Sequence, residues 1–172
     1  MTYYPDLSPC TYFDRNCDIT AEWWASHLIA VGWLDLSELK PHSDVPEADA
    51  VLDPLFRLVS DPWQPALFLG YHPCSFCPGA QPKTATEVTY KGQTYAVGAS
   101  NIFVPGTGKV FVAPSLIAHY VLDHAYRLPN ELRTALQSCP PSRSRAYARA
   151  MKRNGPRAFK TYAWGKWLEG KA

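Results

Sequence analysis

The stretch Pro73-Cys74-Ser75-Phe76-Cys77 carries two cysteines separated by two residues. A spacer of this length lets the backbone fold into a tight knuckle that presents both thiolates to one tetrahedral Zn²⁺. A thioredoxin-type redox pair has the same spacing, but it opens a helix after a strand. Pro78, Gly79 and Pro82 follow within a few residues and disfavour such a helix. The motif therefore predicts a zinc knuckle, with a chance pairing of two buried thiols as the alternative.

The second half of the predicted site lies further along the chain, where His119 and His124 are separated by four residues. That separation falls within the range used by zinc-binding histidine pairs. On a regular α-helix the two positions lie about 140° apart around the axis and about 7.5 Å apart along it. Both histidines therefore reach one metal only where the helix is distorted or ends. We expect Cys74, Cys77, His119 and His124 to hold the metal. His119, in the first turns of its helix, should be the firmer of the two histidine ligands. If only one histidine reaches the metal, His72 or Cys139 is the substitute ligand that completes the site.

The segments between the two halves contain turn signals that predict two β-hairpins. Lys91-Gly92 separates strand-like runs over 87–90 and 93–97, and Gly106-Thr107-Gly108 separates runs over 101–105 and 109–112. A helix over 115–126 follows, with Ser115 as its N-cap. A knuckle, then hairpins, then a ligand-bearing helix is the layout of a treble-clef zinc site.

Apolar periodicity predicts further elements on both sides of this region. Helices are expected over 19–34, over 48–60 with a break or a start near Pro54, and over 129–138, and a buried strand over 66–71. The fold class is therefore α+β, with short β-hairpins and several helices packed around a treble-clef-like zinc site.

The zinc site is expected to be structural. Catalytic zinc usually keeps three protein ligands and an open position, whereas four candidate ligands are present here. A deaminase-like site needs a His-x-Glu motif ahead of the Pro-Cys-x-x-Cys motif. None of the five histidines is followed at the second position by glutamate, so that general acid/base is missing.

The charges divide the chain into two parts. Residues 1–140 contain 8 Lys/Arg and 14 Asp/Glu, whereas residues 141–172 contain 9 Lys/Arg and one acid. We expect one zinc-containing α+β domain over 1–140 and a basic, aromatic-rich C-terminal segment over 141–172 that packs on it.

No apolar stretch is long enough to span a membrane, and the N-terminus has no signal-peptide pattern. We therefore expect no membrane partner. A cytoplasmic location is expected, with the five cysteines as thiols.

The C-terminal segment offers two interpretations. Its aromatic side chains either pack against the domain or stack on unpaired bases, while its cations either remain solvated or contact phosphates. Packing is the interpretation we favour. On the nucleic-acid interpretation, the phosphate-binding side chains are Arg143, Arg145, Arg149, Lys152 and Arg153.

Four short blocks carry a resemblance to a known family. They are Tyr4-Pro5-Asp6-Leu7-Ser8-Pro9, Val31-Gly32-Trp33-Leu34-Asp35, Gly70-Tyr71-His72 with Cys74 and Cys77, and Ala113-Pro114-Ser115-Leu116-Ile117 with His119-Tyr120. Together they resemble a family of small bacterial proteins of unknown function with a Cys-x-x-Cys and His-x₄-His zinc site. The resemblance implies a bacterial origin and a coherent domain, and it implies no activity.

Three functions are compatible with these observations. The first is a zinc-stabilised, non-enzymatic binding module for a protein or nucleic-acid partner. The second is a zinc-dependent hydrolase with an open coordination position. The third is an immunity-type protein whose acidic part neutralises a basic toxin. The number of protein ligands on the metal distinguishes the second from the first.

Overall fold

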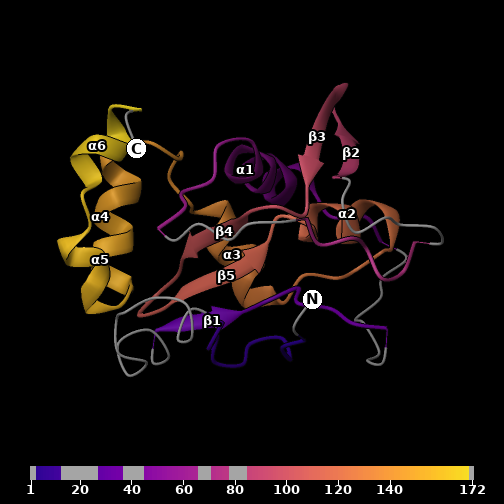
Figure 1. Cartoon of the computed structure of the whole chain (residues 1–172), viewed down its shortest axis with the longest axis horizontal. Helices are drawn as coiled ribbons and strands as arrows, with labels where there is room; N and C mark the ends of the chain where they lie inside the picture. The colour runs from indigo at the N-terminus through magenta and orange to yellow at the C-terminus, as the bar shows by residue number, and fades with distance from the viewer. Residues whose placement is uncertain (1–2, 13–26, 37–44, 66–70, 78–84, 171–172) are drawn as a thin grey trace.

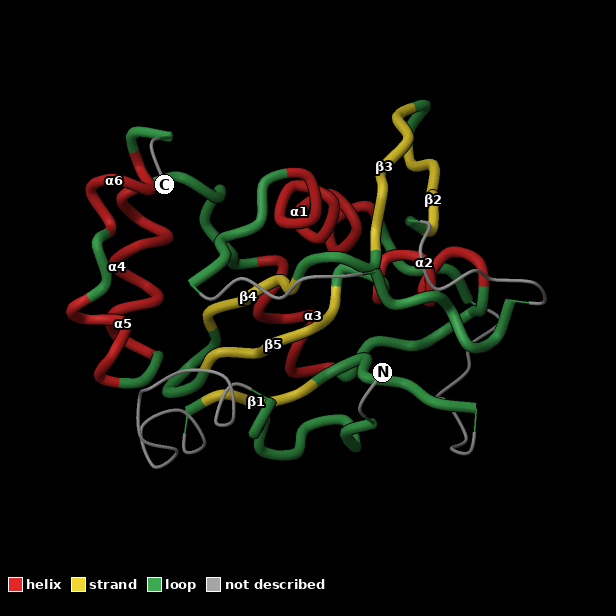
Figure 2. Tube along the Cα trace, viewed as in Figure 1, coloured by secondary structure: helices red, strands yellow, loops and turns green. Residues whose placement is uncertain are grey.

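The computed structural model describes residues 3–12, 27–36, 45–65, 71–77 and 85–170. Two small sheets and six helices make up these parts, which confirms the α+β class (Figures 1 and 2). No helix among them is long and apolar enough to cross a lipid bilayer. The strands are β1 (Leu28–Ala30), β2 (Thr86–Tyr90), β3 (Gln93–Val97), β4 (Asn101–Pro105) and β5 (Val110–Pro114), and the helices are α1 (Asp49–Ser60), α2 (Ile117–Asp123), α3 (Asn130–Gln137), α4 (Arg145–Asn154), α5 (Arg157–Thr161) and α6 (Trp164–Leu168).

The central sheet has the strand order β1-β5-β4. Strand β1 pairs in parallel with β5, and β4 pairs antiparallel with β5. Every residue of β4 and β5 is buried. On the other side of β1 lies the N-terminal segment, where the amide of Cys10 donates to the carbonyl of Leu28 at 2.8 Å. Strand β1 therefore has hydrogen-bonding partners along both of its edges.

The prediction of a helix over 19–34 is wrong for residues 27–34, the part of that range that the structure describes, because residues 28–30 form β1. Residues 19–26 lie outside the described residues. The apolar run from Leu28 to Leu34 is buried almost throughout, so it shows no period that separates a helix from a central strand. Gly32 has a φ of 72° and donates its amide to Asp6 Oδ1 at 2.8 Å.

Both predicted hairpins are confirmed. Strands β2 and β3 pair antiparallel around Lys91-Gly92. Both turn residues have positive φ, 48° and 79°, as a type I′ turn requires. Strands β4 and β5 are joined through Gly106-Thr107-Gly108. The strand predicted over 66–71 lies outside the described residues except for Tyr71, which belongs to no strand.

Three predicted helices are present with shifted bounds. Helix α1 continues through Pro54 without a break and buries seven side chains. Helix α3 matches the prediction over 129–138 closely. Helix α2 is shorter than predicted and begins after Leu116. Ser115 is not its N-cap, because the Ser115 hydroxyl accepts a hydrogen bond from the Gly98 amide at 2.9 Å instead.

The C-terminal helices α4–α6 lie at one end of the sheet (Figure 1). Their aromatic rings gather around Trp63, which stacks on Trp164 at 4.5 Å between centroids and meets Phe159 edge-on at 4.7 Å. In α4 the Tyr147 hydroxyl donates to the carbonyl of Phe103 in β4 at 2.6 Å. These contacts join the helices to the sheet, while a domain boundary at residue 140 remains a prediction.

Candidate metal centre

The knuckle that carries Cys74 and Cys77 is tied to the end of β3. The His72 amide donates to the Gly98 carbonyl at 2.9 Å. Gly98 has a φ of 101°, and a Cβ there would lie 2.7 Å from the His72 carbonyl oxygen, so only glycine allows this close approach. After His72 the chain turns, and the Cys77 amide points back at the Cys74 carbonyl at 3.4 Å. Both thiols thereby lie on one side of the turn.

The end of α2 supplies the two histidines. His119 is the third residue of the helix, and His124 follows its last residue with φ −123° and ψ 13°. The next residue, Ala125, has a φ of 50°. Because the helix ends at Asp123, the His124 ring is no longer held on the regular helical spiral. This termination removes the geometric conflict between two histidines five positions apart.

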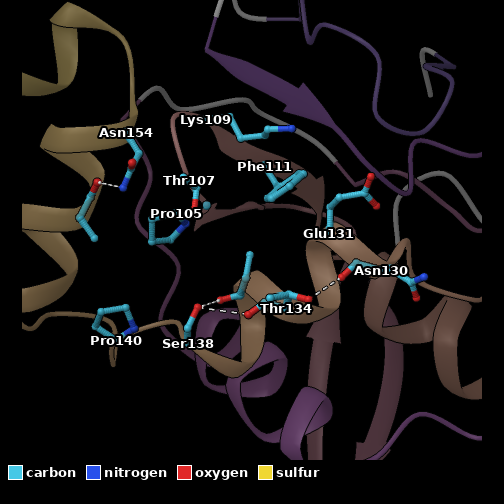
Figure 3. A pocket seen from close by; sticks show the side chains of 13 residues that line it. Pro105, Thr107, Lys109, Phe111, Asn130, Glu131, Thr134, Ser138, Pro140 and Asn154 are labelled. Atoms are coloured by element: carbon cyan, nitrogen blue, oxygen red, sulfur yellow. Dashed lines mark hydrogen bonds between the residues drawn. The ribbon is translucent and has the colours of Figure 1, made fainter.

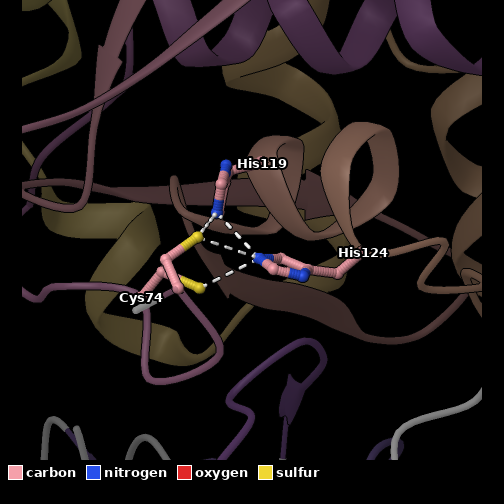
Figure 4. Close-up of side chains that lie close together, drawn as sticks. Cys74, His119 and His124 are labelled. Atoms are coloured by element: carbon pink, nitrogen blue, oxygen red, sulfur yellow. Dashed lines mark hydrogen bonds between the residues drawn. The ribbon is translucent and has the colours of Figure 1, made fainter. Parts of the chain in front are cut away.

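The four side chains converge on one point. The Nε2 atom of His124 lies 3.2 Å from Cys74 Sγ and 3.3 Å from Cys77 Sγ, and His119 Nε2 lies 3.3 Å from Cys77 Sγ. The four ligand atoms all lie within 4.8 Å of one another. Figure 4 shows the two imidazole rings directed at the sulfurs. A sulfur and a nitrogen bound to one tetrahedral zinc lie roughly 3.5 Å apart, so the cluster could hold a metal ion.

Hydrogen bonding alone does not account for this cluster. His119 Nδ1 lies 2.6 Å from Asp123 Oδ2. A carboxylate accepts, so Nδ1 carries the proton and Nε2 of a neutral ring presents a lone pair. His124 Nε2 lies 3.0 Å from that atom and also faces both sulfurs. One N–H cannot donate to three partners, whereas a single cation accepts all four atoms as ligands.

A domain profile described as "Domain of unknown function (DUF7919)" matches residues 2–137. The chain belongs to this family. No curated protein and no solved structure matches it. The match covers the knuckle, both hairpins, α2 and α3, so every residue of the cluster lies inside the DUF7919 domain. It also fits the unknown function that the sequence resemblance implied.

The cluster of this DUF7919 domain is largely shielded from solvent. Cys74 and His119 are buried, and Cys77 and His124 are partly buried. Burial raises the pKa of the Cys74 thiol to about 11 without a metal, and the neighbouring Cys77 adds to that effect. Phe76 covers the His124 ring at 5.6 Å between centroids. A cation here would meet thiolates in a site of low polarity, where charge pairing is strong.

Both predicted substitute ligands, His72 and Cys139, lie outside the cluster. Within the described ranges, the ligand group consists of the two cysteines and two histidines, without His72 or Cys139. Burial lowers the pKa of the partly buried His72. Cys139, at the end of α3, donates its thiol to the Pro140 carbonyl at 3.4 Å, and burial raises its pKa to about 12. The sequence analysis missed Asp123, although its i+4 spacing places it on the same helix face as His119.

A cavity of about 610 Å³ lies away from the cluster, between the β4–β5 hairpin, α3 and α4 (Figure 3). Part of its polar lining is engaged within the chain. Thr134 donates its hydroxyl to the Asn130 carbonyl, and Asn154 Oδ1 accepts from the Gly108 amide. Among the residues that line the cavity, Glu131 is the one possible metal ligand of the His, Cys, Asp or Glu type, so the cluster remains the better candidate for chemistry.

The five predicted phosphate-binding side chains are not equivalent. Arg143 is engaged inside the chain, because it pairs with Asp61 Oδ2 at 2.6 Å and donates to the Trp167 carbonyl at 2.6 Å. Arg145, Arg149 and Arg153 are exposed on α4, and Lys152 is half-buried beside them. Of the five aromatic rings expected to stack on bases, four are turned inward and at most 3% exposed, namely Tyr147, Phe159, Trp164 and Trp167. The fifth, Tyr162, is partly buried and meets Trp63 edge-on at 5.1 Å.

Proposed function

We propose that the protein is a non-enzymatic binding module stabilised by one zinc ion, held by Cys74, Cys77, His119 and His124. The convergence of these four ligand atoms within 4.8 Å carries the proposal. Two thiolates and two imidazoles form the donor set that tetrahedral zinc prefers. The knuckle and the end of α2 are more than 40 positions apart in sequence. A metal between them would cross-link two segments that are distant in the chain.

The donor set favours a structural over a catalytic role. Four protein ligands would complete a tetrahedral shell and leave no position for water. A hydrolase also needs a general base beside the metal. The carboxylate in contact with the cluster, Asp123, is already engaged by His119 Nδ1 at 2.6 Å. It therefore serves to orient His119 in this proposal.

The location and origin of the protein belong to the same proposal. The cysteines within the described residues are Cys10, Cys74, Cys77 and Cys139, and all four are free thiols. Free thiols suit the reducing cytoplasm, as expected from the sequence. The treble-clef arrangement and a bacterial origin remain part of the proposal as well.

Metal analysis of the full chain, purified without chelators, tests the proposal. We expect about one zinc per chain, bound by two sulfurs and two nitrogens in an X-ray absorption measurement. Cys77→Ser should lose the metal and lower the melting temperature, because binding of a structural metal is coupled to folding. Cys139→Ser is the matched control and should keep the metal. A protein free of zinc, or a zinc with three protein ligands and a water, contradicts the proposal.

A further inference from the structure

Helix α4 has one face against the sheet and one face in solvent. Tyr147 and Met151 are fully buried on the inner face. Arg145, Arg149 and Arg153 follow one another at intervals of four residues, and all three are exposed. Positions i, i+4 and i+8 lie on one side of a helix, about 6 Å apart along its axis. The three guanidinium groups therefore form a single row, here called the arginine row.

The arginine row has no acidic counterpart among the residues that the structure describes. Residues 141–168 contain no Asp or Glu. None of the ion pairs within the described parts of the chain involves Arg145, Arg149 or Arg153. Arg143 differs, since it is paired with Asp61. The three cations of the row thus repel one another without local compensation, which favours an anionic partner.

The surface between these arginines is shaped to admit a ligand. A hollow of about 210 Å³ lies between Arg149 and Arg153, and the small residues Ala146 and Ala150 form part of its lining. Because alanine side chains are short, an anionic group could approach the helix between two guanidinium forks. Guanidinium groups bind phosphate oxygens through two parallel hydrogen bonds.

The support of α4 makes this surface rigid. Ser144 caps the helix by accepting from the Tyr147 amide at 3.0 Å. The Tyr147 hydroxyl anchors the helix to β4 through the Phe103 carbonyl at 2.6 Å. At the other end, Asn154 accepts from the Gly108 amide of the β4–β5 hairpin at 3.0 Å. The backbone that carries the row is therefore held in place at both ends, so the helix does not have to be ordered when a ligand binds.

The surroundings of the row distinguish between anionic partners. Protein interfaces usually contain apolar anchors at their centre, yet the exposed large hydrophobic residues among the described residues all lie outside α4–α6. Binding of single strands relies on exposed aromatic rings. In the C-terminal segment four of the five rings are buried, and the fifth, that of Tyr162, is partly buried against Trp63. Contact with the phosphates of a duplex needs neither feature.

We propose that the arginine row binds the phosphate backbone of double-stranded nucleic acid without reading its sequence. The inference rests on the proposed binding-module function and names its partner. Each arginine that neutralises a phosphate steepens the dependence of log Kobs on log[salt] by about 0.9. At about 0.1 M salt this corresponds to roughly an eightfold contribution to affinity per arginine.

Fluorescence anisotropy with labelled 20-base-pair DNA and RNA duplexes of two unrelated sequences, measured from low to moderate salt, tests this inference. We expect similar affinity for both sequences and weaker binding of the matching single strands. Arg149→Ala/Arg153→Ala should weaken duplex binding by about 60-fold and flatten the salt slope by about 2. The matched control, Arg57→Ala/Arg127→Ala, removes the same charge from exposed positions outside α4 and should have little effect.

Several outcomes overturn the inference. They are a wild-type chain that binds no duplex, tighter binding of single strands, equal affinity for polyglutamate, and an equal loss in the control. Zinc content and melting temperature are measured for every protein. A zinc-loaded chain without duplex binding refutes this inference alone, whereas duplex binding by a chain that never holds zinc refutes the metal proposal alone.

Discussion

Asp123→Ala is the sharpest test of the metal centre, because it leaves all four proposed ligands in place. Asp123 Oδ2 lies 2.6 Å from His119 Nδ1, and the Asp123 side chain is 50% exposed while that of His119 is 7% exposed. A carboxylate that orients a ligating histidine typically contributes roughly 10–100-fold to metal affinity. Because half of the Asp123 side chain is exposed, solvent screens its carboxylate. We therefore expect a loss of zinc affinity at the lower end of that roughly 10–100-fold range. We expect zinc binding to weaken by about tenfold, or about 1.4 kcal/mol.

Competition with a chromogenic chelator at neutral pH measures this affinity in the full chain. Asp123→Asn keeps an oxygen that accepts from Nδ1, so its loss should be smaller than that of Asp123→Ala. Glu131→Ala removes an exposed acid from α3 and serves as the control. Wild-type affinity in Asp123→Ala, or an equal loss in Glu131→Ala, refutes the orienting role.

Three further predictions concern stability. Tyr147→Phe leaves the buried Phe103 carbonyl without its 2.6 Å donor and should cost about 1–3 kcal/mol, measured by urea unfolding; an unchanged midpoint contradicts it. Ala125→Gly replaces an alanine that has a left-handed backbone conformation, which is unfavourable for any residue with a Cβ. After the greater conformational entropy of glycine in the unfolded chain is subtracted, the free energy of unfolding should rise by about 0.5–1 kcal/mol. A lower melting temperature contradicts this prediction. Truncation after Pro141 removes Phe159 and Trp164, whose rings pack against Trp63. Because buried apolar area is lost, the melting temperature should fall. An equal melting temperature in the truncated and full-length proteins refutes the packing of the C-terminal segment on the domain.

Local turn chemistry made the hairpins predictable. Lys91-Gly92 and Gly106-Thr107-Gly108 interrupt β-prone runs, and short-range sterics suffice to select a chain reversal there. Helix α1 was predictable for a similar reason, since its apolar residues repeat at helical spacing along one face. The start of α2 was not predictable from the sequence. The Ser115 hydroxyl does not cap the helix, because it accepts a hydrogen bond from the amide of Gly98, 17 positions away.

The composition of the candidate site followed from spacing, but its geometry did not. Cys74 and Cys77 are close by virtue of their two-residue spacer. The approach of both histidines to this pair of cysteines depends on two features of the backbone. Helix α2 ends at Asp123, and Ala125 has a positive φ. Neither feature has a strong sequence signal, since the residue at the left-handed position is alanine rather than glycine. The preference for His119 over His124 remains a prediction, and the distances give His124 two sulfur neighbours and His119 one.

By itself, the sequence determined the α+β class, the hairpins, the cysteine and histidine set, and the concentration of cations after residue 140. These properties depend on residue types and on neighbours within a few positions. Only the tertiary structure decided that Leu28–Ala30 is a strand, because β5 and the N-terminal segment hydrogen-bond to its two edges. Its short apolar run is buried almost throughout and has no period that separates a strand from a helix. Only the tertiary structure showed that the aromatic side chains of the C-terminal segment face inward while the arginines of α4 face solvent. The apolar surface around Trp63 draws the aromatic rings inward, and the helical period then leaves Arg145, Arg149 and Arg153 facing solvent.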